Sequence, residues 1–368
     1  MSGNLFSDVY DVSHTLFGKD ASNVESIERC RDEVFQAIRD DTVPEKLRYL
    51  MFKMTNYCNS DCAYCSHAVN SKSHEKKAQI PYEIIKRTIC EAGELGTSAL
   101  SINGGEPLLM PFVGDIVTDA IEQNITPVLM TNGLLLPEKW EGLAERGLRY
   151  IIMSFDSMDP VVYEKQRGVK FSDAFRGVKA AVKMIERYPE TQIHVTAVLT
   201  RQNMNEIPGF IRQMSEMGIC VQLSPYHHYN PHQPDLLSIS DRAEAQRMTD
   251  ILLDMKANGL RIGNSVGFLE HIPTFFADKK RVPDGYRCLI GYTNLFIDAY
   301  MNARPCWASC FEPVGNIGRE SLKDIWYSEK MKKYRRQMLR SECEGCWYLC
   351  TGEVTMFLEN ALDIGSGT

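Results

Sequence analysis

The stretch Cys58-Asn59-Ser60-Asp61-Cys62-Ala63-Tyr64-Cys65 determines what fold and chemistry this chain can have. Its three thiolates stand at spacings that suit three corners of a [4Fe–4S] cluster, for which cysteine thiolate is the usual ligand. The fourth iron would then be open to a small molecule, as in catalytic metal sites, and the ring of Tyr64 could lie against it. Short cysteine spacings also suit zinc, with His67 as a fourth ligand, so a zinc knuckle is the alternative.

The composition is that of an ordinary globular protein, with 368 residues, of which 44% are hydrophobic and 24% charged. This length predicts two or three domains. The net charge of -7 argues against a general nucleic-acid binder. The N-terminus has no basic region followed by an apolar core, and no apolar run approaches membrane-spanning length. We therefore expect a cytoplasmic protein that contacts neither nucleic acid nor membrane.

The chain contains twelve cysteines without a secretory signal, which favours metal ligation in a reducing compartment over disulfides. Nine of them form two groups, one in the quoted stretch and one near the C-terminus. The exceptions are Cys30, Cys90 and Cys220. Cys30 and Cys90 lie in helical patterns and are predicted to be buried as small apolar residues.

From Leu47 onward, strand-like runs alternate with helical periodicity. The strand-like runs are Leu50–Met54, Ala99–Asn103, Pro127–Thr131, Tyr150–Phe155, Ile193–Leu199 and Cys220–Pro225. The helical segments are Pro81–Leu95, Val113–Gln123, Glu138–Arg146, Ser172–Arg187 and Asn205–Met217. Six alternations predict an α/β fold with a parallel sheet and helices outside it. Because a closed barrel needs eight units, we expect a partial (β/α)6 barrel.

The same pattern divides the chain into five parts. A helical extension over residues 1–45, with one helix from about Asn23 to Arg39, precedes the partial barrel over residues 46–235. A helical connection over residues 236–283 leads to a cysteine-rich domain over residues 284–352 and a tail over residues 353–368. These boundaries follow the places where the strand–helix alternation begins and ends.

Polar motifs follow four of the predicted strands at their carboxyl ends. The cysteine stretch follows the first, Gly104-Gly105-Glu106-Pro107 the second, Thr131-Asn132-Gly133 the third and Ser154-Phe155-Asp156 the fourth. Two glycines let the backbone approach a ligand closely, and a proline makes the turn rigid. In parallel α/β folds, ligands gather beyond these strand ends, so one shared binding site is predicted.

The order of these motifs resembles the radical S-adenosylmethionine (SAM) superfamily over most of the chain. The resemblance implies that Cys58, Cys62 and Cys65 hold a [4Fe–4S] cluster that binds SAM. It implies that the Gly-Gly-Glu-Pro motif binds the methionine amino group and that Ser154 meets the ribose. Arg167 would meet the methionine carboxylate, which its planar fork suits. The remaining candidates for SAM contact are Tyr64, Thr131, Asn132 and Asp156, although Asp156 could instead cap the next segment.

The reaction that this resemblance implies is reductive. An electron from the cluster enters SAM, a C–S bond breaks, and a 5′-deoxyadenosyl radical removes a hydrogen atom from the substrate. The protein would hold the substrate carbon close to the radical and exclude water. The electron implies an external one-electron reductant such as flavodoxin or ferredoxin.

The second cysteine group comprises Cys288, Cys306, Cys310, Cys343, Cys346 and Cys350. Two of its members flank a hairpin-like sequence in which residues alternate from Phe296 to Met301 and Asn302 suits the turn. This order resembles the SPASM/twitch extension of radical SAM enzymes, which binds auxiliary [4Fe–4S] clusters. A full SPASM domain has seven cysteines, two clusters and a glycine where this chain has Met301, so we expect one auxiliary cluster.

The expected ligands of the auxiliary cluster are Cys288, Cys306, Cys343 and Cys346, with Cys350 as the main competitor. Cys310 would then be a free thiol that could donate a hydrogen atom to the substrate. Because zinc needs only four cysteines, a zinc ribbon is the alternative for this region.

Two substrate classes remain open. The first is a residue of a ribosomally made peptide, which would be crosslinked, epimerised or oxidised, with a possible separate peptide-recognition protein. The second is a carbinol of a small molecule such as an amino sugar or cyclitol, which would be oxidised or epimerised. A loop with His227, His228 and His232 could bind or deprotonate a polar substrate, and packing against the extension is an equal alternative. Trp307 stands where sulfatase-maturing relatives have an acidic residue, which weighs against that activity.

Overall fold

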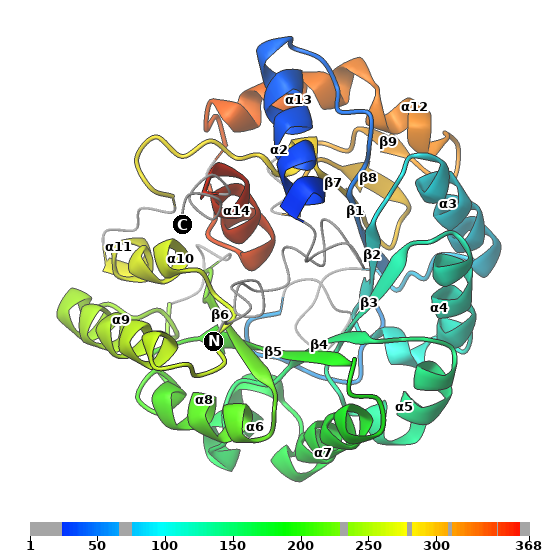
Figure 1. Cartoon of the computed structure of the whole chain (residues 1–368). Helices are drawn as coiled ribbons and strands as arrows, with labels where there is room; N and C mark the ends of the chain where they lie inside the picture. The colour runs from blue at the N-terminus through cyan, green and yellow to red at the C-terminus, as the bar shows by residue number, and fades with distance from the viewer. Residues whose placement is uncertain are drawn as a thin grey trace.

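The computed structural model describes residues 24–65, 76–228, 235–277, 282–307, 311–343 and 345–360. In this α/β fold, a sheet curves around an interior and helices cover its outer side (Figure 1). No helix within the described ranges is long and apolar enough to cross a lipid bilayer.

The first six strands form a parallel sheet in chain order, as predicted. They are β1 (Tyr49–Thr55), β2 (Ala99–Gly104), β3 (Thr126–Thr131), β4 (Tyr150–Ser154), β5 (Gln192–Leu199) and β6 (Cys220–Pro225). The sheet ends at β6 on one side and does not close on itself. This open sheet confirms the partial barrel.

The outer helices follow the strands that they cover. They are α3 (Tyr82–Glu94), α4 (Val113–Glu122), α5 (Leu136–Glu145), α7 (Phe171–Arg187), α8 (Ile207–Glu216) and α9 (Arg242–Ala257). Burial alternates along β5, where Ile193 and Val195 are buried and His194 and Thr196 are partly exposed. This period of two places one face of the strand under the helices and the other toward the interior.

Several helices were not predicted, and one of them is α6 (Pro160–Arg167), which carries Arg167 in its last turn. The side chain of Asp159 accepts hydrogen bonds from Val161 N and Val162 N, so it caps the helix. Pro160 occupies the first helical position, and Gly168 ends the helix with a φ of 66°. The alternative that Asp156 caps this segment is therefore wrong.

The C-terminal region extends the same sheet. Strand β7 (Asn294–Ile297) pairs in parallel with β1, with Asn294 opposite Tyr49. Strands β8 (Asn302–Arg304) and β9 (Gly315–Asn316) follow in antiparallel order. The auxiliary region is thus joined to the edge strand of the barrel through backbone hydrogen bonds.

The predicted turn of this hairpin is wrong by one residue. Asn302 is the first residue of β8, and the turn lies before it. There the Asp298 side chain accepts hydrogen bonds from Tyr300 N and Asn302 N, and Met301 has a φ of 68°. This left-handed conformation is one that glycine adopts without strain, which explains why SPASM relatives are expected to have glycine at this position.

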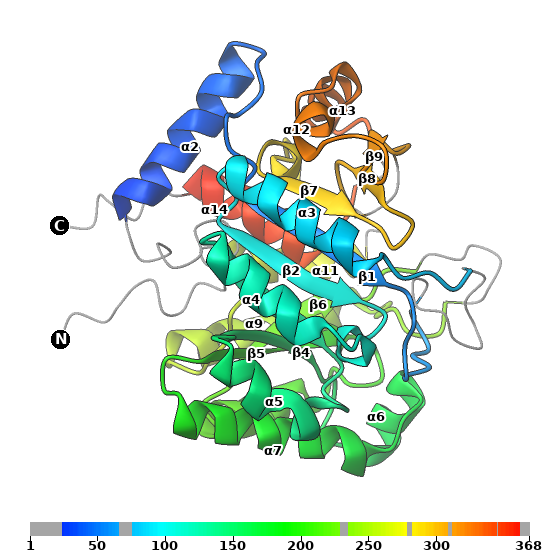
Figure 2. The ribbon, with the colours of Figure 1, turned by 90° about the vertical axis from the view of Figure 1, so that its right-hand side faces the viewer.

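The remaining helices gather at the amino ends of the strands and around the C-terminal region. They are α2 (Val24–Arg39), α10 (Val266–Glu270), α11 (Ile272–Ala277), α12 (Leu322–Trp326), α13 (Glu329–Leu339) and α14 (Val354–Asn360). Figure 2 shows α2 and α14 together at one side of the sheet. Apolar side chains of both helices form one cluster with the inward-facing Tyr49 and Met51. Cys30 of α2 is fully buried as predicted, whereas Cys90 of α3 is only partly buried.

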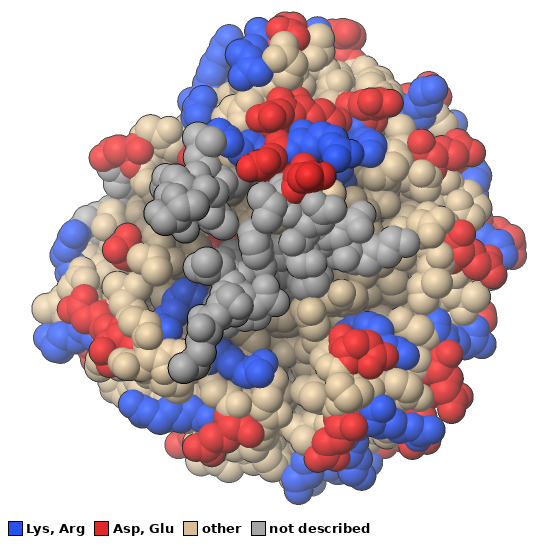
Figure 3. Space-filling model, in the orientation of Figure 1, with Lys and Arg blue, Asp and Glu red and all other residues tan. Residues whose placement is uncertain are grey.

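Charges of both signs alternate on the face that carries α2 (Figure 3). Arg48 pairs with Glu33 of α2, and Arg336 of α13 pairs with Asp41 just after α2. These ion pairs link the N-terminal helix to the barrel and to the C-terminal region.

Candidate active site

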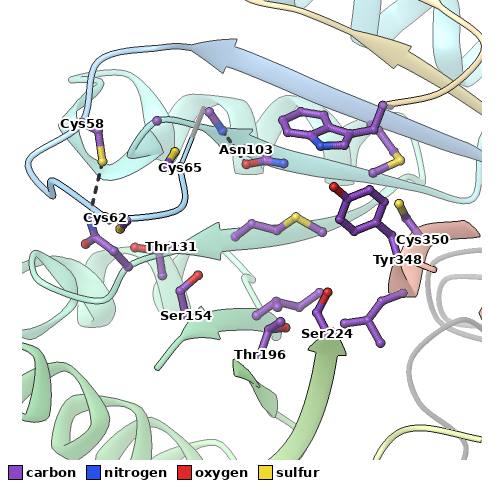
Figure 4. Close-up of a pocket in the computed structure, with 18 of the residues that line it drawn as sticks. Cys58, Cys62, Cys65, Asn103, Thr131, Ser154, Thr196, Ser224, Tyr348 and Cys350 are labelled. Carbon is purple, nitrogen blue, oxygen red and sulfur yellow. Dashed lines mark hydrogen bonds between the residues drawn. The ribbon is translucent and has the colours of Figure 1, made fainter. Parts of the chain in front are cut away.

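A cavity of about 380 Å³ lies inside the curve of the sheet (Figure 4). The side chains of Cys58, Cys62 and Cys65 line one part of it, and Tyr348 and Cys350 line the other. Its walls come from seven strands of the sheet, β1 to β7, and from segments on both sides of it. The residues between the two parts are Met51, Asn103, Met130, Ile152, Thr196 and Ser224, among others.

The cysteine stretch is held by the end of β3. Asn132 Nδ2 lies 2.7 Å from Asn59 Oδ1, 2.9 Å from Ser60 Oγ and 3.9 Å from Cys58 Sγ. Thr131 and Asn132 also line the cavity. The Thr-Asn-Gly motif therefore fixes the shape of the loop that carries the thiols.

The two glycines at the end of β2 pack against the same loop. Gly105 N donates to Thr55 O at 2.7 Å, and Glu106 N donates to Tyr57 O at 2.7 Å. A Cβ atom at Gly104 would lie 2.5 Å from Thr55 O, and one at Gly105 would overlap the backbone of Tyr57. Glycine is needed here because the backbone that leads into the cysteine stretch, at Thr55 and Tyr57, approaches so closely.

Glu106 is fully buried and joins the ends of two strands. Its carboxylate accepts hydrogen bonds from Leu108 N at 2.9 Å, Thr131 Oγ1 at 2.8 Å and Asn132 N at 2.8 Å. Burial raises the pKa of the Glu106 carboxyl to about 7. Within the described residues, the cavity wall includes Gly104 and Gly105 but not Glu106 or Pro107.

Arg167 lines the cavity, and Asp156 holds its guanidinium group. Its Nε and Nη2 atoms bind the two carboxylate oxygens of Asp156 at 2.6 and 2.7 Å, which is a bidentate pair. Its Nη1 atom lies 3.9 Å from Cys62 Sγ, and the Tyr64 hydroxyl donates to the same Asp156 carboxylate. The planar fork that was predicted to meet the methionine carboxylate thus already holds a carboxylate of the protein.

His227 connects the barrel to the second cysteine group. Its Nδ1 lies 2.8 Å from Pro225 O, and its Nε2 lies 3.0 Å from Trp347 N. A neutral ring satisfies both contacts, because Nδ1–H donates and Nε2 accepts. The ring stacks on Tyr348 with centroids 3.8 Å apart.

His228 lies 3.1 Å from the Tyr226 hydroxyl through its Nδ1 atom, and neither histidine belongs to the cavity wall within the described residues. The other two histidine candidates, His67 and His232, and the candidate thiol Cys310 lie outside the described residues.

The second group brings five thiols together. Cys288, Cys306, Cys343 and Cys350 belong to one apolar cluster that includes Phe311 and Met338. Burial raises the pKa of the Cys288 thiol, and neighbouring Cys346, Cys306 and Cys343 raise it further. Cys350 is partly buried beside Cys346 and Cys306, and it also lines the cavity.

The spacing of these thiols can be compared with what each metal requires. A single zinc ion with bonds of about 2.3 Å brings its sulfur ligands to within about 4 Å of one another. No group of three Cys, His, Asp or Glu side chains among the described residues is arranged to hold one ion. A [4Fe–4S] cluster binds each thiolate through a different iron, so its ligands lie further apart. The arrangement of thiols in the described part of the chain is thus compatible with clusters; His67 and Cys310 lie outside that part.

Metal binding at the first group would be coupled to the release of protons. Burial raises the pKa of the Cys58 thiol to about 11, so the bare thiol would hold its proton at neutral pH. A bound metal centre deprotonates a coordinating thiol. A cluster held by these cysteines would therefore bind them as thiolates, and its binding would release their protons.

Comparison with known protein families agrees with this geometry. Residues 52–214 match the model of the radical SAM superfamily, and residues 288–347 match that of an iron–sulfur cluster-binding domain called SPASM. The chain belongs to the radical SAM superfamily. Within it, the C-terminal domain places the chain in the SPASM subgroup, as the resemblance of the sequence implied.

Curated relatives include enzymes that act on different substrates. PqqA peptide cyclase from Gluconobacter oxydans is 25% identical over 294 residues, which are 78% of this chain and 77% of the relative. A probable GTP 3′,8-cyclase from Methanocaldococcus jannaschii is 30% identical over 186 residues, or 50% of this chain. The match spans only 60% of that cyclase.

Solved structures with a similar fold include two with bound S-adenosylmethionine. SuiB from Streptococcus suis bound to S-adenosylmethionine has a TM-score of 0.64 and 18% identity, covering 84% of this chain and 72% of SuiB. anSMEcpe with bound SAM and the Kp18Cys peptide has a TM-score of 0.61 and 18% identity, covering 83% of this chain and 88% of anSMEcpe. At these identities, the likeness establishes the fold.

Proposed function

We propose that this protein is a radical SAM enzyme that modifies a residue of a ribosomally made peptide. The observation that carries the proposal is the cavity, which connects the first cysteine group to the second. Much of its wall between them is apolar, from Met51, Met130, Ile152, Leu349 and Val354. An amino sugar or cyclitol could meet Asn103, Thr196 and Ser224 with some of its hydroxyl groups, but those placed against the five apolar residues would be buried without hydrogen-bond partners, which is costly. A peptide side chain suits it better.

The relatives support the same substrate class. PqqA peptide cyclase is named for a peptide substrate. SuiB has been solved with its precursor peptide SuiA, and anSMEcpe with the Kp18Cys peptide. As part of the same proposal, this enzyme crosslinks, epimerises or oxidises a residue of its peptide.

We assign Cys58, Cys62 and Cys65 to the SAM-binding [4Fe–4S] cluster. When bound, the cluster and SAM supply a radical that can remove a hydrogen atom from the substrate. The chain's own residues hold this site in place, since Asn132 fixes the loop and the glycines of β2 admit its backbone. Gly104, Gly105, Thr131 and Ser154 form the adjoining wall, where SAM would lie.

Arg167 has a positioning role in this proposal. Because Asp156 fills its fork, Arg167 steadies Cys62 and Tyr64 instead of binding the methionine carboxylate. His227 has a comparable role, since it joins Pro225 to Trp347 and supports the ring of Tyr348 at the cavity wall.

We further propose one auxiliary [4Fe–4S] cluster, held by four of the five thiols in the second group. Cys306 and Cys346 are neighbours of both Cys288 and Cys350, which makes them the central pair of ligands. Electrons would come from an external one-electron reductant of the flavodoxin or ferredoxin kind.

SAM cleavage that depends on peptide tests the proposed function. A precursor peptide encoded beside this gene should raise 5′-deoxyadenosine formation at least about tenfold over the rate without substrate, because a bound substrate captures the radical productively. A scrambled peptide of the same composition is the control. Stimulation by 2-deoxystreptamine, an aminocyclitol, with none by the peptide would contradict the proposal and favour the small-molecule class.

A further inference from the structure

Asn294 is the first residue of β7, the strand that the C-terminal region adds to the sheet. It stands opposite Tyr49 of β1, and Tyr49 and Met51 both line the cavity. Paired residues of neighbouring strands face the same side of a sheet, so the Asn294 side chain faces inward. It belongs to the cavity wall itself.

The carboxamide of Asn294 has no partner in the described protein. The residue is only 1% exposed, and both Oδ1 and Nδ2 are buried without a hydrogen bond. Buried polar groups almost always have partners, and each exception calls for an explanation. The unpaired carboxamide of Asn294 lies at a cavity, so a bound ligand can supply the hydrogen-bond partners that the protein does not.

The ligand group that would satisfy Asn294 can be inferred from its chemistry. A carboxamide offers two donors and one acceptor, which complement another amide. Apart from the thiols, Arg167 is the sole ionisable Lys, Arg, His, Asp or Glu side chain in the described cavity wall, and Asp156 neutralises it. A charged ligand group near Asn294 would therefore find no counter-ion, whereas an uncharged amide beside apolar carbon fits.

We propose that Asn294 is a specificity-determining residue that recognises an amide group of the substrate, next to an uncharged apolar side chain. The inference rests on the proposed function and narrows it, because it selects peptides that place an apolar residue in the cavity. The amide comes either from the peptide main chain or from a carboxamide side chain.

Four small probes test this inference on the anaerobic, cluster-loaded protein with SAM. N-methyl-4-methylpentanamide mimics a main-chain amide, and 4-methylpentanamide mimics a carboxamide side chain. Methyl 4-methylpentanoate has the same apolar chain but no N–H donor, and 2-deoxystreptamine represents the alternative substrate class. Dissociation constants are measured by ligand-observed NMR. We expect an amide to bind about tenfold more tightly than the ester, as one or two hydrogen bonds allow.

The variants Asn294→Leu and Asn294→Ala should lose this preference and still bind the ester. Because Asn294→Leu removes an unsatisfied buried group, its melting temperature should match or exceed that of the wild type. Thr249→Val is the matched control: it removes another buried, unpartnered oxygen, from α9 and outside the cavity wall. This control should keep the preference for the amide.

Three results would overturn the inference: equal amide preference in the wild type and both variants, no binding of either amide, or a marked loss of stability in Asn294→Leu. The last would show a structural role.

The proposed function is tested separately by the precursor peptide. If that peptide stimulates SAM cleavage equally in the wild type and Asn294→Leu, only the role of Asn294 fails; if 2-deoxystreptamine binds in place of the amides, both fail.

Discussion

Replacing Cys58, Cys62 and Cys65 together by alanine is expected to reduce SAM cleavage to background and to halve the bound iron. With one SAM-binding and one auxiliary cubane, the reconstituted wild type should hold about eight irons per chain and the triple variant about four. The second group of thiols lies in its own apolar cluster, so its iron should survive. The measurements are 5′-deoxyadenosine by chromatography and iron and sulfide by chemical analysis.

The matched controls are Cys90→Ala and Cys220→Ala, which remove thiols that are also partly buried but lie outside both groups. Both should retain SAM cleavage and the full iron content. A triple variant that still cleaves SAM would contradict the assignment of the first group. About twelve irons in the wild type would show two auxiliary clusters in place of one.

Gly105→Ala should have the second largest effect, lowering SAM cleavage by at least about a hundredfold, because misplacing catalytic groups by about 1 Å can cost that much. The new Cβ atom would overlap the backbone of Tyr57, the residue just before Cys58. Backbone atoms cannot turn aside as a flexible side chain can, so the cysteine stretch must shift. SAM cleavage and iron content in the first site are the measurements.

Gly142→Ala and Gly209→Ala provide controls for the same chemical change. They lie in α5 and α8, where a Cβ atom would meet nothing within 4 Å. Both should leave SAM cleavage unchanged and stabilise the protein by about 0.5–1 kcal/mol, since alanine favours helices over glycine. Wild-type activity and iron in Gly105→Ala would show that the close approach is not required.

Much of the barrel could be predicted because its signals are local. Each buried strand is a short apolar run such as Tyr150–Ser154, and the polar motifs mark where the strands end. Helix α6 also had local signals, since Asp159 and Pro160 suit a helix start and Gly168 a helix end. These three residues are enough to indicate the helix from the sequence alone.

Other features depend on contacts that are distant in sequence. The pairing of β7 with β1 joins Asn294 to Tyr49, and nothing in a four-residue strand specifies which edge it will meet. The bidentate pair between Asp156 and Arg167 depends on how the chain turns between β4 and α6. Sequence could show that Arg167 suits a carboxylate but not which carboxylate it binds.

The central claim is that three thiolates leave one iron of a cubane open to SAM, and electron paramagnetic resonance tests it most directly. Anaerobically prepared, reduced protein should show a [4Fe–4S] signal that changes when SAM is added and that the triple alanine variant lacks. The auxiliary signal should be the same with and without SAM. Finding zinc in place of iron, or a cubane signal that SAM leaves unaltered, would contradict the account.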